Sequence, residues 1–343
     1  MTLQQHRNAS LDAARSLACL LMISQHVPIP LSPGSAAVKA VWNYVAFWSI
    51  PLFFMISGAL ALSKPRPLLP YVRGRLLHIA LPMVVWTIVF LVTEAAAGQL
   101  AWATTVERMI LIPFAPQASV FWFIYVLMGL YCLVPVAARW LEHATRREVE
   151  LLLTLWGLTL LVPFVALVCG ASRHLLELHQ GWLFAFQGYG GMMLLGYYLW
   201  RWVVPVARWW HLALLAAACV LLPVGIYACG LPHGLAQGDA TLPVTLTAAV
   251  LLVACLKSRP ASLTARWATA FARRSYGVYL VHILLVHWVV FPLFRPLNID
   301  YAFQIPLLTL FTAAAAWAIV WLIDQIPSGH YVTGTRISKT SNK

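Results

Sequence analysis

Long runs of apolar residues, separated by short polar segments, recur along the whole chain. A run of about 20 apolar residues is the length that an α-helix needs to cross a bilayer. Such runs lie near residues 11–30, 40–62, 76–98, 119–138, 150–170, 182–203, 210–230, 241–256, 274–294 and 303–323, and the eighth is short. The pattern predicts an all-α, polytopic integral membrane bundle of about ten transmembrane helices, with residues 1–343 forming one integral membrane domain.

The positions of the basic residues give an independent check, because cytoplasmic loops are enriched in lysine and arginine. If the N-terminus is cytoplasmic, ten spans place nearly all of the 23 basic residues on the cytoplasmic side. The exceptions are Arg15, inside the first span, and Lys39, Arg108, Arg173 and Arg295, on the opposite side. We therefore expect both termini to be cytoplasmic. No small-residue cleavage site follows the first apolar run, so we expect it to be retained as a span.

The composition fits a membrane protein, with 62% hydrophobic and 10% charged residues, where a soluble domain has about 25% charged residues. The mean hydropathy is +0.80. The net charge of +13 is spread over short loops rather than one soluble face, so we expect no nucleic-acid partner. The cysteines lie in apolar runs without metal-ligand spacing and predict neither disulfides nor a metal site: Cys19, Cys132, Cys169, Cys219, Cys229 and Cys255.

The first span carries the polar residues Asp12, Arg15, Gln25 and His26. Arg15 and His26 are eleven residues apart, which places them about 20° apart around a helix and about 16 Å apart along its axis. Asp12 lies about one turn before Arg15, on nearly the same side. Ionisable groups inside a bilayer usually mark a working site. The spacing therefore predicts a polar wall that faces a cavity inside the bundle.

The end of this span supports a cavity beside His26. Pro28 lacks the N–H that would bond to the carbonyl of Ser24, and a free carbonyl at membrane depth needs protein or water around it. Two simpler interpretations remain open for the charged residues. Arg15 lies close enough to the helix start to snorkel to the headgroups, and an intramembrane His26 also suits a hydrogen-bonded packing role.

Two other segments carry weaker signals. The basic, proline-rich stretch 64–78 suits either orientation of the protein with contact to anionic lipid, or an anion site for phosphates. Ser57 and Gly58 in the second span, and the glycine-dense stretch 187–196, predict close contacts between helices.

The ninth span is the second polar one. Ser275 and His282 are seven residues apart and share a face, which Tyr279 flanks, while Arg273 and Arg274 lie at the cytoplasmic end.

Two further residues, His287 and Asp324, lie near the ends of the last two predicted spans. His287 points away from the face of His282 on a regular helix, and we interpret it as structural. Asp324 ends the tenth span at the cytoplasmic edge, where we expect it to pair with Arg273 or Arg274.

Four motifs together resemble the membrane acyltransferase-3 family. They are Leu11-Asp12-x-x-Arg15 with His26, Pro51–Gly58, Trp122-Phe123 with Tyr131–Pro135, and Ser275–His282. The motifs occur in the family's order over nearly the whole chain, and in size the chain resembles the short O-acetyltransferase members, similar to enterobacterial common antigen O-acetyltransferases. One departure is Arg75-Leu-Leu-His78, where the family usually has R-x-x-R.

The resemblance implies a multi-pass protein of the bacterial cytoplasmic (inner) membrane. It implies transfer of an acyl group, usually acetyl from acetyl-CoA as co-substrate, to a hydroxyl of a carbohydrate or lipid-linked glycan, with membrane lipid as surroundings and no metal. A transporter or flippase of a lipid-linked glycan or other anionic substrate remains the alternative, because it too needs a polar cavity and basic loops.

We assign roles to the polar residues on this hypothesis. The CoA phosphates are held by Arg15, Arg73 and Arg75 with Arg273 or Arg274. His26 acts as general base or accepts the acyl group itself, and Asp12 orients Arg15. The acceptor side is lined by Ser275, Tyr279, His282 and Trp122.

Overall fold

Helices make up all of the secondary structure in the described part of the chain, residues 3–28, 36–168, 182–258, 260–297 and 299–335 of a computed structural model. The α-helices are α1 (Leu3–Gln25), α2 (Ala36–Phe47), α3 (Ser49–Ala61), α4 (Leu68–Ala96), α5 (Trp102–Leu111), α6 (Trp122–His143), α7 (Arg146–Val168), α8 (Gly190–Tyr198), α9 (Trp209–Ala228), α10 (Leu242–Lys257), α11 (Ser262–Leu285), α12 (Phe291–Phe294), α13 (Tyr301–Asp324) and α14 (His330–Thr333). Shorter turns of 3-10 or π geometry are η2 (Ser119–Phe121), η5 (Trp182–Phe186), η6 (Leu199–Val203), η7 (His233–Leu235), η8 (Val286–Val290) and η9 (Arg295–Leu297).

Seven helical segments of the described residues are long and apolar enough to cross a membrane. The chain is therefore an all-α, multi-pass membrane protein, as the sequence predicts. The other three predicted spans are helical but less regular: α1 carries charged residues, and α10 has 16 residues. The stretch 182–203 is not one continuous helix, because Gly188, with φ +100°, separates η5 from α8. The number of ten spans stays a prediction.

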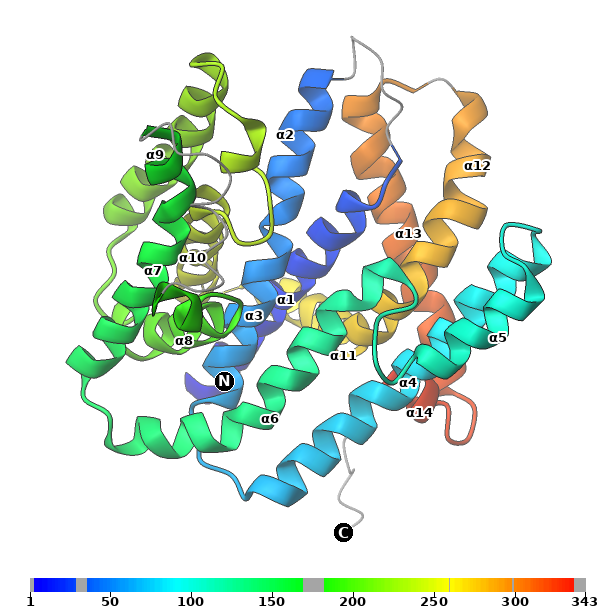
Figure 1. The fold of residues 1–343 in the computed structure, drawn as a ribbon, viewed down its shortest axis with the longest axis horizontal. Coiled ribbons are helices and arrows are strands. Elements are labelled where there is room, and N and C mark those ends of the chain that lie inside the picture. The colour runs from blue at the N-terminus through cyan, green and yellow to red at the C-terminus, as the bar shows by residue number, and fades with distance from the viewer. Residues whose placement is uncertain (1–2, 29–35, 169–181, 259, 298, 336–343) are drawn as a thin grey trace.

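Helix α1 lies in the middle of the molecule, with α7–α10 on one side and α4, α5, α12 and α13 on the other (Figure 1). It contacts α2, α3, α10, α11 and α13. The outer helices instead present apolar side chains to the surroundings, as α9 does with Leu214 and Leu221, which are 62% and 67% exposed. The polar wall of α1 is thus covered by protein, whereas the lipid-facing surface is apolar.

Helices α3 and α8 approach each other at two glycines. A Cβ atom added at Gly58 would lie 1.8 Å from the carbonyl oxygen of Met193, and one added at Gly196 would lie 2.0 Å from that of Met55. Each glycine therefore faces a carbonyl of the other helix. The close contact predicted from these glycines is confirmed, and it fixes α8 against the helix that packs beside α1.

The helix ends fall into two groups, because successive membrane helices alternate in direction. We call one group the basic end: it holds the starts of α1, α4, α7 and α11 and the end of α13. The opposite group, which we call the far end, holds the end of α4, the start of α6 and η8. Most described lysines and arginines lie at the basic end, which is the side predicted to be cytoplasmic.

The connection between α9 and α10, at the far end, contains one buried carboxyl group. Asp239 is hydrogen-bonded to Tyr189, and its Oδ1 atom is buried without a hydrogen-bond partner. Burial raises the pKa of Asp239 from 3.8 to about 6, although the hydrogen bond from Tyr189 acts in the opposite direction. This carboxyl group therefore titrates closer to neutral pH than an exposed one.

Candidate functional site

The first half of α1 holds its polar residues against α11. The Thr269 hydroxyl donates to Oδ2 of Asp12 at 2.9 Å, and the Ser16 hydroxyl donates to the carbonyl of Ala268 at 3.1 Å. Arg15 and Arg273 interact with Asp12 through their charges. This half of the polar wall is thus a helix contact, which fixes the rotation of α1 and with it the direction in which His26 points.

His26 lies one residue beyond the end of α1. Its N–H donates to the carbonyl of Ile23 at 3.0 Å, which tightens the last turn. The carbonyl of Ser24, expected to be free, accepts the N–H of Val27 at 3.4 Å, so this expectation was wrong. The chain leaves the helix through a tight turn, in which the N–H of Val27 takes the place of the donor that Pro28 lacks. His26 is consequently carried on a short, defined turn at the far end.

A cavity of about 510 Å³ opens beside His26 at the far end. A volume of this size suits a small ligand. Its polar lining comes from four segments that are distant in sequence, and two aromatic and two aliphatic side chains complete it. The lining residues are His26, Phe90, Glu94, Gln99, Ser119, Val120, Ile283, His287 and Trp288.

Behind His26, the predicted residues of α11 form a buried layer. The ring centroids of His26 and His282 are 5.2 Å apart. Nδ1 of His282 lies 2.5 Å from the carbonyl of Tyr279. Because a carbonyl only accepts, the neutral His282 ring carries its proton on Nδ1. Nε2 of His282 is then an acceptor, and it is buried without a partner among the described residues.

Tyr279 and Ser275 are engaged with the backbone rather than with the open cavity. The Tyr279 hydroxyl donates to the carbonyl of Val120, which lies in the cavity wall. The Ser275 hydroxyl donates to the carbonyl of Ala272 at 2.9 Å, and the side chain is buried. These two residues therefore support the wall around His26 from behind.

Trp122 belongs to a group of aromatic rings beside the cavity wall. Its ring centroid is 5.4 Å from that of Tyr189, which stacks on Phe54 at 4.8 Å. Trp122 does not line the cavity beside His26, although Ser119 and Val120, just before it, do. The structure brings it close to the site through η2, without placing it in the opening.

His287 is a site residue that the sequence interpretation missed. It lies in the wall of the same cavity as His26, on the π-helical turn η8. On a regular helix His287 points away from His282, and it shares a face with Ile283, four residues earlier, which lines the same cavity. The orientation was therefore predictable, whereas the cavity on that face was not. Glu94 and Gln99 were also missed, because only the fold brings the end of α4 to His26.

The arginines expected to hold phosphates are in different surroundings at the basic end. The guanidinium of Arg75 lies 5.5 Å from the ring centre of Tyr71 and 5.0 Å from that of Tyr131. Arg73 and Arg273 are exposed. The structure therefore separates these arginines into one held by aromatic rings and two that extend from the surface.

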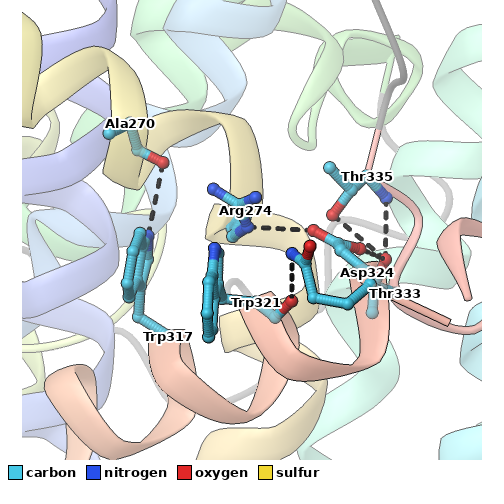
Figure 2. A network of polar contacts seen from close by, with 8 residues as sticks. Ala270, Arg274, Trp317, Trp321, Asp324, Thr333 and Thr335 are labelled. Atoms are coloured by element: carbon cyan, nitrogen blue, oxygen red, sulfur yellow. Dashed lines mark hydrogen bonds and ion pairs between the residues drawn. The ribbon is translucent and has the colours of Figure 1, made fainter.

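Arg274 is held by a carboxylate. Its Nε donates to Oδ2 of Asp324 at 2.9 Å, and Asp324 also accepts the Thr333 hydroxyl at 2.6 Å (Figure 2). The expected pairing of Asp324 with an arginine of α11 is thereby confirmed. This network ties α14 to α11 and α13 and compensates the charge of Arg274, which leaves Arg274 less available to a phosphate than the other arginines.

Comparisons with known proteins agree with these features. The acyltransferase-3 family model, described as an acyltransferase domain, matches residues 8–323. The match includes α1 and His26 at one end of the chain and α13 at the other. No curated protein and no solved structure matches the chain.

Proposed function

Because the chain belongs to the acyltransferase-3 family, we propose that this membrane acyltransferase moves an acetyl group from acetyl-CoA to a hydroxyl of a carbohydrate or lipid-linked glycan. Its place is the bacterial cytoplasmic membrane, with the basic end in the cytoplasm. The observation that carries the proposal is the cavity of about 510 Å³ around His26, on a turn held in place by the central helix α1. The opposite, basic end suits the phosphates of CoA.

In the proposed reaction, the acceptor hydroxyl binds beside His26. A neutral imidazole takes the hydroxyl proton while the oxygen attacks the thioester carbonyl. The carbon–sulfur bond breaks, and the thiolate of CoA takes the proton from the imidazolium. The products are an acetyl ester and CoA with its thiol, so His26 ends in the state in which it began. His282 acts as a positioning residue, because its ring packs against that of His26 from the buried side.

The donor has to extend through much of the membrane thickness in this arrangement. Arg15 and His26 are about 16 Å apart along the axis of α1, with Arg15 toward the basic end. Phosphates at the basic end and a thioester near His26 require an extended donor, and CoA has an extended arm. The same separation allows the acceptor to enter from the far end, where Glu94, Gln99 and His287 line the opening.

The test uses purified protein in nanodiscs with radiolabelled acetyl-CoA and a glycolipid extract as the source of acceptor. Free CoA is measured with a thiol reagent, and the label is followed into protein and into glycan. We expect His26→Gln to reduce turnover by about 10²–10⁴-fold, the usual contribution of a general base. His143→Gln, an exposed histidine at the end of α6, is the matched control and should retain wild-type turnover.

Two results would contradict the proposal. Wild-type activity in His26→Gln would remove His26 from the reaction. A well-folded wild-type protein that neither binds nor turns over acetyl-CoA would favour a transporter, which has no use for the thioester. Label that accumulates on His26 in the absence of acceptor would instead indicate an acyl-enzyme, and direct transfer would be excluded.

A further inference from the structure

Two arginines converge on one tyrosine at the start of α4. The guanidinium of Arg66, in the connection before α4, lies 5.5 Å from the ring centre of Tyr71. The guanidinium of Arg75, one turn further along α4, lies at the same distance from that ring. Arg75 also lies over the ring of Tyr131 on α6. Three separate segments thus bring two positive charges to one place at the basic end.

These two charges have no carboxylate beside them. Among the described residues, the ion pairs with carboxylates involve Arg146 and Arg274, and neither Arg66 nor Arg75 forms one. Aromatic rings attract a cation only weakly compared with an anion, because they carry a quadrupole and no net charge. Two guanidinium groups on one ring therefore repel each other without a compensating negative charge, and an anion between them would remove this repulsion.

The same place contains polar atoms without hydrogen bonds. Tyr71 is only 8% exposed. Its hydroxyl lies against Arg75 but forms no hydrogen bond of ordinary geometry, and the Nε atom of Arg66 is likewise buried without a partner. Buried polar groups are nearly always hydrogen-bonded in folded proteins. An unpaired hydroxyl and an unpaired guanidinium N–H side by side therefore point to an acceptor supplied by a ligand.

We propose that Arg66, Tyr71 and Arg75 form a phosphate-binding site at the basic end. Guanidinium groups bind phosphate oxygens through paired N–H donors, and the Tyr71 hydroxyl adds a third donor. Arg73 does not share in this site, because it lies about 200° around the helix from Arg75 and is exposed. The ligand is a phosphate of CoA, an identification that rests on the proposed function. A lipid headgroup phosphate has the same chemistry.

The first experiment measures CoA affinity in nanodiscs made of zwitterionic lipid, by calorimetry and without acceptor. We expect Arg66→Gln and Arg75→Gln each to raise the Kd about tenfold, the loss of one charge-assisted contact. Tyr71→Phe keeps the ring and loses only the hydroxyl, and we expect an increase of about threefold. Arg139→Gln, an exposed arginine at the same end, is the control and should bind as the wild type does. The melting temperature of each variant without ligand shows whether it is folded.

The second experiment repeats the melting measurements in nanodiscs with phosphatidylglycerol in place of phosphatidylcholine. If Arg66→Gln and Tyr71→Phe bind CoA normally but lose a stabilisation by phosphatidylglycerol that the wild type shows, the ligand is lipid and the site stands. If both variants match the wild type with CoA and with phosphatidylglycerol, the site is refuted. Turnover of acetyl-CoA by the wild type then separates the two proposals. If the wild type turns over acetyl-CoA normally while both variants match it in binding, only the phosphate site is refuted. If phosphate binding depends on Arg66 but the wild type does not turn over acetyl-CoA, only the proposed acyltransferase reaction is refuted.

Discussion

Replacing Gly196 with alanine introduces a methyl group where α8 meets the backbone of α3. The added Cβ would lie 2.0 Å from the carbonyl oxygen of Met55, whereas ordinary contact begins at 3.4 Å. The two helices would therefore have to separate by roughly 1.4 Å at this point, because backbone atoms cannot rotate away as a side chain does. Inserting a carbon into a packed contact usually costs about 1–3 kcal/mol, and we expect about 2 kcal/mol here.

The assay follows thermal unfolding of purified protein in detergent with a thiol-reactive dye. Cys229 is free and exposed, so it is replaced by serine in all variants, whereas Cys19 and Cys219 are free and buried and react only when the bundle opens. A loss of about 2 kcal/mol should lower the melting temperature by roughly 3 °C, because the unfolding entropy of a chain of 343 residues is large. The heating rate is kept constant, because membrane proteins often unfold irreversibly.

The matched control is Gly129→Ala in α6, where nothing lies within 4 Å of the added Cβ. Alanine is a better helix former than glycine by about 1 kcal/mol, so this variant should be as stable as the wild type or more so. Gly58→Ala should destabilise like Gly196→Ala, and the double variant should lose less than the sum, because both act on one contact. A Gly196→Ala protein that melts within about 1 °C of the wild type would refute the reasoning.

Two further predictions concern the far end. For Asp239, the pKa of about 6 in the folded protein exceeds the ordinary 3.8, so its contribution to stability is greatest below pH 4 and is lost as the pH rises to 6. Asp239→Asn should therefore be more stable than the wild type at pH 7.5, by about 1–2 kcal/mol after allowance for partial exposure. The difference in stability should vanish near pH 4. Melting curves that show an equal difference at both pH values would contradict this prediction. His287→Asn should raise the KM for the acceptor about tenfold and leave the Kd for CoA unchanged, since His287 lines the cavity and not the basic end. Weakened CoA binding in this variant would exclude that role.

The sequence predicted those features that depend on local periodicity and on charge. The helical repeat places Asp12 and Arg15 on one side of α1, although this half of the wall packs against α11 instead of facing a cavity as predicted. The pairing of Asp324 follows from its place at a helix end beside arginines. The glycines of α3 and α8 indicated a close contact, although their reciprocal match with Met55 and Met193 needed the fold. These predictions rest on residue types and on their positions along single helices, which the sequence contains.

The features that the sequence interpretation missed depend on irregular turns and on long-range contacts. His287 was interpreted as structural because the cavity that it lines with Ile283 forms only where the end of α4 and η2 meet α11 and η8. The stretch 182–203 was predicted as one span, but Gly188 adopts a conformation that ends the helix. Glu94 and Arg66 gain their meaning from partners that lie elsewhere in the chain. No local pattern contains that information, because it depends on how whole helices pack.

The π turn at Val286–Val290 also determines how a change in the length of the gene would alter this region. Such a turn has one residue more than the α-helix it interrupts, so the deletion of a single codon there would restore a regular helix. His282 and the buried half of α11 would stay where they are, while every side chain from the turn to α12 would rotate by about 100°. One in-frame change would therefore move His287 and Trp288 relative to the opening, and it would also rotate Val290, which is fully buried against Val27, Ile305 and Leu308. The lining of the cavity beside His26 and the packing of Val290 are thus coupled through one turn, so a change in the length of that turn alters both at once.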